Sequence, residues 1–86
     1  IMNKRLAIIG IFMKNERDEE ALNQILKEHY KYLINKNEVV QINGETTVLT
    51  IILEATETVI STMAGKIGGL KGMHSKVIYA KDTKKY

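Results

Sequence analysis

The run from Leu6 to Met13 consists of eight apolar residues, with charged residues before and after it. Eight residues suit a strand better than a helix, and the three isoleucines of the run also favour a strand. Because successive side chains of a strand point to opposite faces, the even-numbered and odd-numbered positions form two faces, both of them apolar. Any sheet that contains this strand therefore carries apolar side chains on both of its surfaces.

An amphipathic helix is predicted near residues 16 to 30. Asn15 is the expected N-cap, and the acidic residues between positions 16 and 20 place negative charge in the first turns, where the helix dipole favours it. The apolar positions that follow recur at steps of three, four and seven residues, so they share one stripe. These positions are Leu22, Ile25, Leu26 and His29.

Strands joined by a tight turn are predicted between residues 32 and 55. The pair Asn43-Gly44 is typical of a hairpin turn, because both residues tolerate positive φ. The expected antiparallel partners are Val39 to Ile42 and Thr46 to Leu53, and a short strand from Tyr32 to Asn35 can continue into the first of them. The odd-numbered positions of the later strand form its more apolar face.

A second helix is predicted at residues 57 to 68, and a last strand from Met73 to Lys81. Thr56 is the expected cap of this helix, whose apolar residues again follow the helical spacing. Gly68, Gly69 and Gly72 then suit a helix C-cap and a tight turn, because glycine adopts left-handed conformations readily.

The predicted order is therefore β-α-β-β-α-β, which is typical of the ferredoxin-like α+β fold. Two helices cover one face of a four-stranded antiparallel sheet in that fold. A chain of 86 residues supports one core, so we expect a single domain over residues 2–82 and a polar tail at 83–86. Ile1 is left out because Met2 is the expected initiator.

The sheet face without helices is expected to be covered by a second copy of the chain, as a homodimer or homotetramer. Valine or isoleucine occurs on both faces of the first and third strands, and such a patch is larger than a soluble monomer usually exposes. Either face of the first strand satisfies this argument, so both assignments stay open. For the even-numbered face, the expected interface residues are Ile8, Phe12, Val48 and Ile52.

Composition removes several classes of protein. The chain has no cysteine, which excludes disulfides, thiolate metal sites and cysteine nucleophiles. Its first apolar run ends at Lys14 without a small-residue cleavage site and is too short to span a bilayer, so we expect no membrane association and a cytoplasmic location. The net charge of +3 comes from lysines spread along the chain, and direct operator binding would need a more concentrated basic element.

No pattern typical of catalysis is present, and we predict no enzymatic activity, no metal and no cofactor. His29 and His74 are the only imidazoles, and His29 fits a packed position on its helix. The glycines of residues 65 to 72 follow a helix rather than precede one, so they do not form a phosphate-binding loop. An RNA-binding module is a further alternative, although Phe12 is the only aromatic residue on the first and third strands.

Residues 65 to 76, with the sequence GKIGGLKGMHSK, resemble the helix-to-last-strand signature of the regulators of the iron-only hydrogenase system. That family is similar to ACT domains and to the C-terminal domain of nickel-responsive regulators. The resemblance, which covers Arg5 to Lys81, implies a regulatory domain that oligomerises and acts on transcription or maturation linked to the hydrogenase. Related ACT domains bind small-molecule effectors near the loop after the first strand, which points to Asn15 and Arg17 as ligand contacts. The alternative is a structural protein-interaction module without a small ligand.

Overall fold

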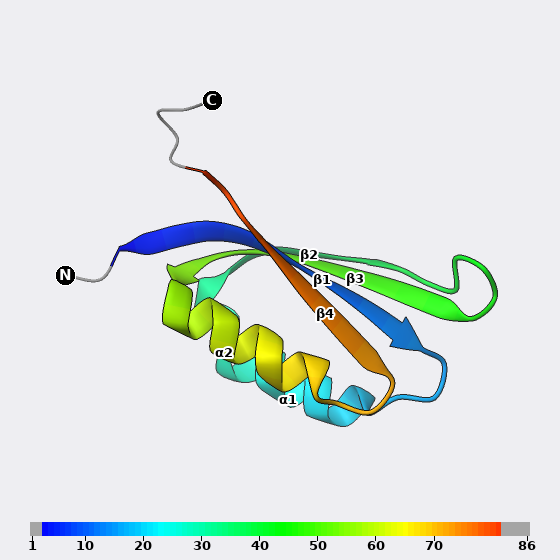
Figure 1. The fold of residues 1–86 in the computed structure, drawn as a ribbon. Helices are drawn as coiled ribbons and strands as arrows, with labels where there is room; N and C mark the ends of the chain where they lie inside the picture. Colours follow the sequence, from blue (N-terminus) through cyan, green and yellow to red (C-terminus); the bar gives the residue numbers. More distant parts are fainter. Residues whose placement is uncertain (1–2, 82–86) are drawn as a thin grey trace.

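The computed structural model describes residues 3–81, which form one antiparallel sheet with two helices on the same side of it (Figure 1). The elements are β1 (Lys4–Lys14), α1 (Glu19–Glu28), a single 3₁₀ turn (Tyr30–Tyr32), β2 (Leu33–Val39), β3 (Thr46–Thr56), α2 (Glu57–Gly68) and β4 (Met73–Tyr79). The predicted ferredoxin-like βαββαβ order is confirmed. Met2 and Asp82, at the ends of the expected domain, and the expected tail at 83–86 lie outside the described residues.

The sheet has the strand order β2-β3-β1-β4, so the apolar β1 lies between two neighbours. β1 and β3 pair along their whole length, from Lys4 opposite Thr56 to Lys14 opposite Thr46. β2 is an edge strand, and all of its residues after Leu33 are exposed. β1 and β3 are therefore the central strands, and β2 and β4 form the two edges of the sheet.

The core lies between the sheet and the two helices. The odd-numbered residues of β1 point into it, which decides between the two faces that the sequence left open. The more apolar face of β3 also points inward, as predicted. The largest side chains of the core are fully buried, among them Ile9 on β1, Ile51 on β3 and Ile60 on α2.

The first helix begins later than predicted. α1 spans Glu19–Glu28, and its N-cap is Asp18, whose side chain accepts a hydrogen bond from the backbone of Ala21. The prediction of Asn15 as the cap is therefore wrong. Residues 14 to 18 instead bond to the loop between α2 and β4: the amide of Lys14 donates to the carbonyl of Gly72 at 2.8 Å, and the amide of Asp18 donates to that of Lys71 at 3.1 Å. These long-range bonds keep the segment extended until Asp18.

The hairpin between β2 and β3 differs from the predicted one in its pairing. β3 pairs with residues Leu33 to Val39, with a bulge near residue 34, so Val40 to Ile42 are not part of the strand. Gln41 has a φ of 50°, which turns the chain out of the sheet before the expected turn. The side chain of Asn43 accepts hydrogen bonds from the amides of Glu45 and Thr46, and only Gly44 of the Asn-Gly pair has positive φ.

The second helix and the last strand follow the prediction closely. α2 spans Glu57–Gly68, and the Thr56 hydroxyl accepts a hydrogen bond from the amide of Val59. β4 ends at Tyr79, two residues earlier than expected. Among the glycines after α2, Gly72 alone has positive φ, at 72°. A Cβ on Gly72 would lie 2.3 Å from the carbonyl oxygen of Glu16, so the joint between the two loops has no room for a side chain.

Replacing Gly72 by alanine is therefore expected to lower the free energy of unfolding by about 2 to 4 kcal/mol, through backbone strain and the clash with the Glu16 carbonyl. Gly65→Ala is the matched control. Gly65 is exposed on α2 with open space around it, so alanine should raise the free energy of unfolding by about 0.5 to 1 kcal/mol through helix propensity. Urea denaturation at one fixed protein concentration measures both changes. Equal effects of the two substitutions would contradict the role of Gly72.

Candidate functional site

The sheet surface that faces away from α1 and α2 is the most unusual part of the molecule (Figure 1). We call it the open face. It is formed by the even-numbered residues of β1, β3 and β4, because the odd-numbered ones point into the core, and by Asn35, Asn37 and Val39 of β2, which pair with even-numbered residues of β3. Within residues 3–81 no element covers it, and five large apolar side chains on it are 39% to 66% exposed. These are Leu6, Ile8, Phe12, Val39 and Ile78.

Strand register arranges the open face in rows that cross the sheet. One apolar row runs through Val39, Val48 and Phe12 and ends at His74. A second apolar row contains Ile52, Ile8 and Ile78. The row between them is polar and contains Asn37, Thr50, Gly10 and Lys76. The face thus carries two apolar rows with a polar row between them.

Gly10 lies in the middle of that polar row, opposite Thr50 on one side and Lys76 on the other. A Cβ built on Gly10 would meet nothing within 4 Å, and the residue does not have positive φ. Neither packing inside the domain nor backbone conformation therefore requires glycine at this position. A glycine inside a strand weakens the strand and often marks the close approach of another backbone or a ligand.

The four predicted interface residues come together on the open face. Ile8 is paired with Ile52, and Phe12 with Val48, in the register of β1 and β3. Ile8 and Phe12 are exposed, whereas Val48 and Ile52 are half-buried. Val39 and Ile78 also lie on this face, although neither was predicted as part of it. The alternation of β4 places Ile78 on this face, but its position beside Ile8 follows only from strand order.

The two predicted effector contacts lie in the loop between β1 and α1, and the structure gives each of them a partner within the chain. Arg17 donates to the carbonyl of Lys14 at 3.0 Å and forms an ion pair with Glu19 at 2.9 Å. Asn15 contacts the hairpin, with its Nδ2 3.4 Å from the carbonyl of Gly44. The two side chains therefore bind different segments of the chain.

The two histidines lie in separate places. Nδ1 of His29 is 2.7 Å from the carbonyl oxygen of Ile25, at the C-terminal end of α1. The ring of His74 on β4 lies beside that of Phe12, with the ring centroids 6.5 Å apart. In the described part of the chain, no three histidine or carboxylate side chains gather as a metal site would require. Neither of the helices in that part is long and apolar enough to cross a membrane.

Comparison with known proteins identifies the family. Residues 5–77 match the family model of TM1266-like proteins, described as "Iron-only hydrogenase system regulator, putative". The chain belongs to this family. The resemblance seen at residues 65 to 76 is thereby confirmed. None of the curated proteins matches the chain.

A solved structure agrees with the fold of this regulator-family chain. The uncharacterized protein TM1266 from Thermotoga maritima matches with a TM-score of 0.83 and 18% sequence identity, over 92% of this chain and 100% of that one. LarC2, the C-terminal domain of a cyclometallase involved in synthesis of the NPN cofactor of lactate racemase, gives a TM-score of 0.49 at 7% identity, over 90% of this chain and 56% of that one. At 18% identity the first match supports the fold alone.

The loop that carries Asn15 and Arg17 yields a test of the revised helix start. Asp18→Ala removes the side chain that caps α1 and is expected to lower the free energy of unfolding by about 1 kcal/mol. Asn15→Ala, four residues outside the helix, should change it by less than about 0.5 kcal/mol. Thermal or urea unfolding of the two variants compares them directly. A larger loss from Asn15→Ala would restore Asn15 as the cap.

Proposed function

We propose that this chain is a non-catalytic regulatory subunit of the iron-only hydrogenase system that acts as a homo-oligomer, with its subunits joined through the open face. The acting unit is the single domain of residues 2–82, and its proposed location is the cytoplasm. Membership of the regulator family supports the regulatory role. The observation that best supports association of the subunits is the uncovered apolar face of the sheet.

The size of the apolar surface supports association through this face. Five large side chains that are about half exposed would contribute roughly 4 to 8 kcal/mol per subunit on burial, as an upper estimate. Both subunits bury the same surface in a two-fold dimer, so the total exceeds the lower estimates of what association costs. A small domain that left this surface in water would forgo stability comparable to its own free energy of unfolding.

The dimensions of the face fit a second copy of the chain. Four strands about 4.8 Å apart and roughly 30 Å long give a footprint on the order of 600 Å², and accessible area exceeds this flat projection. A stable interface buries about 800 Å² on each partner, so one face-to-face contact uses the whole sheet surface. Closed two-fold symmetry is the commonest arrangement for such a contact.

The relief of the open face is also self-complementary. An apolar hollow of about 340 Å³ lies at the Leu6 end of the face, bordered by Ile52 and Ile78, while Phe12 projects at the other end. A two-fold axis that crosses the strands near Gly10 brings Phe12 of each copy opposite the hollow of the other. Gly10 then allows the two sheets to approach closely where the axis passes.

A small-molecule effector is the second part of the proposal, with Asn15 and Arg17 as its contacts. The Asn15 contacts are long, at 3.4 Å, and therefore weak enough for a ligand to replace. The Arg17 guanidinium already binds a carbonyl and a carboxylate oxygen, so a ligand would join or displace Glu19. The effector would bias the assembly, and through it transcription or maturation linked to the hydrogenase.

Two other functions differ from this proposal in what the chain would bind. A structural interaction module would assemble in the same way but bind no small ligand. An RNA-binding module would use the open face itself, and Lys76, His74 and Phe12 are the side chains there that suit a nucleic acid. Direct operator binding by this chain alone is not part of the proposal, because its basic residues are dispersed.

Light scattering of the full chain at tens of micromolar is expected to give at least twice the mass of one chain. Gly10→Val should weaken the association by at least about tenfold, because its side chain projects into the contact between the sheets. The domain itself should fold normally, since valine suits a strand and the site is free of neighbours within the chain. Ile52→Asp should dissociate the assembly as well.

Ile42→Asp provides the matched control, because Ile42 is 62% exposed but lies in the hairpin beyond β2. It should leave the mass unchanged. A wild-type mass equal to one chain would refute the oligomer. An oligomer that both Gly10→Val and Ile52→Asp leave intact would show that the subunits join elsewhere, such as along strand edges.

Calorimetry with amino acids, nucleotides and divalent metal ions separates sensing from a purely structural module. If the chain senses an effector, at least one of these ligands gives a saturable heat. Arg17→Ala should then lower the affinity for that ligand about fivefold, because a partly exposed charged contact is lost. Lys66→Ala, an exposed charge on α2, is the control. The absence of heat with every ligand favours the structural module, and micromolar, salt-dependent binding of RNA favours the RNA module.

A further inference from the structure

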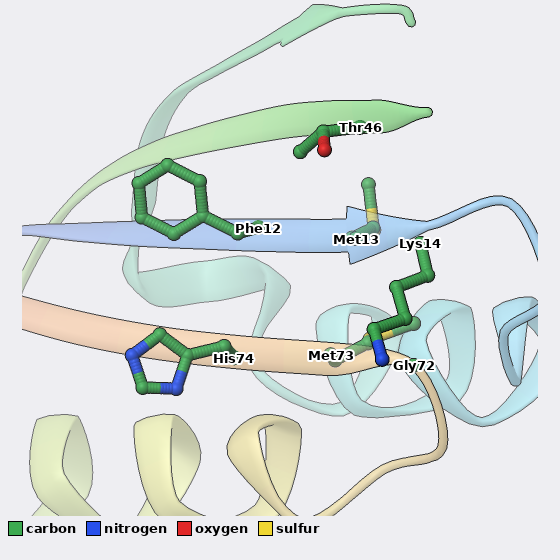
Figure 2. Close-up of a pocket in the computed structure, with 7 residues that line it drawn as sticks. All are labelled: Phe12, Met13, Lys14, Thr46, Gly72, Met73 and His74. Atoms are coloured by element: carbon green, nitrogen blue, oxygen red, sulfur yellow. The ribbon is translucent and has the colours of Figure 1, made fainter. Parts of the chain in front are cut away.

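A cleft of about 430 Å³ lies where the open face meets the end of β1 and the start of β4 (Figure 2). Its walls come from Phe12, Lys14, Thr46, Met73 and His74. The cleft is within the usual range of volumes for small-molecule sites. It adjoins the loop that holds Asn15, but it is formed by other residues.

The charged groups of the cleft are all basic. Lys14 and His74 are its ionisable residues, and no carboxylate lines it. Across residues 3–81, neither side chain takes part in a salt bridge, whereas the nearby Lys71 is paired with Glu16 at 2.7 Å. Figure 2 shows the Lys14 side chain reaching from β1 toward Met73 at the start of β4. The cleft thus presents an unpaired ammonium group at its Gly72 end and an imidazole beside Phe12 at the other end (Figure 2).

The remaining walls are apolar, with one hydroxyl. The rings of Phe12 and His74 lie side by side on adjacent strands, 6.5 Å apart and tilted by 32° (Figure 2). Met13 is fully buried and Met73 packs against the core, so both side chains lie on the other side of the sheet from Phe12. Thr46 contributes a hydroxyl at the opposite side from β4. A ligand here therefore meets an aromatic surface on one part and a positive charge on another.

The base of the cleft is held in place by the backbone. The amide of Lys14 donates to the carbonyl of Gly72 at 2.8 Å, which joins the end of β1 to the start of β4. Gly72 packs against Glu16 and Arg17 with no room for a side chain. Sites whose supporting residues are locked in this way lose little entropy on binding.

We propose that this cleft binds a small carboxylate that carries an aromatic or branched apolar group. The carboxylate is held by Lys14, and the apolar group packs on the rings of Phe12 and His74. The inference rests on the proposed function, because it gives the effector a chemical class and a binding surface that adjoins the loop of Asn15 and Arg17. Phe12 also belongs to the open face, so the ligand touches the surface where the second copy is proposed to bind.

Titration of the full, isotopically labelled chain with phenylacetate, followed by amide NMR shifts, tests this site. We expect saturable shifts at residues 12–14, 46 and 72–74. Acetate, which lacks the ring, and benzyl alcohol, which lacks the charge, should each bind at least about tenfold more weakly, because each retains half of the contacts. Inorganic phosphate should also bind weakly.

Lys14→Ala and His74→Ala should each weaken phenylacetate binding about fivefold, whereas Lys66→Ala on α2 should not change it. All three side chains are exposed, so folding is expected to be unaffected. The proposal is overturned if phenylacetate gives no saturable shifts, if benzyl alcohol or phosphate binds as tightly, or if the shifts are confined to residues 15–17. Because the proposed dimer contact covers Phe12, the titration is repeated on Ile52→Asp, which is expected to be monomeric and whose changed residue does not line the cleft. Absence of saturable shifts in both proteins overturns the site and leaves the oligomer standing, whereas shifts in the monomer alone show that the second copy competes with the ligand.

Discussion

The structure depends on one strand that is apolar on both sides. β1 lies inside the sheet, and its odd-numbered residues from Ala7 to Met13 are buried under α1 and α2 with less than 2% exposure. A chain with two helices can cover only one surface of a four-stranded sheet, so the even-numbered residues of β1 remain in water. Every feature of functional interest follows from this division: the inward surface provides the stability of the domain, and the outward surface is available to something outside it.

Much of the fold was predictable from short-range patterns. The alternation of β3, the helical spacing of α2 and the capping hydroxyl of Thr56 are local signals, and each was confirmed. The start of α1 was not predictable, because it is set by bonds from residues 14 and 18 to the loop before β4, more than fifty residues away. The hairpin register was missed for a similar reason, since the bulge near residue 34 and the positive φ of Gln41 leave no clear trace in composition.

The candidate site also combines residues that the sequence predicts with residues that only the fold brings together. Ile8, Phe12, Val48 and Ile52 follow from alternation once one face is chosen, and packing of the odd-numbered residues makes that choice. The cleft beside them depends on which strands are neighbours: His74 lies next to Phe12 only because β4 adds to the free edge of β1. Asn15 and Arg17 were selected by family resemblance, and their contacts with Gly44 and Glu19 could not be read from the sequence.

The exposed edge strand β2 limits how far an assembly of this kind can grow. Its residues Lys36, Asn37 and Glu38 are polar, and the bulge near residue 34 interrupts its pairing pattern. Charges and bulges at a sheet edge oppose the addition of further strands. Under the proposed assembly, each chain offers one apolar surface, and that surface is used up by a single two-fold contact. Such a molecule forms closed particles of fixed size, and it resists the open-ended stacking that leads to fibres.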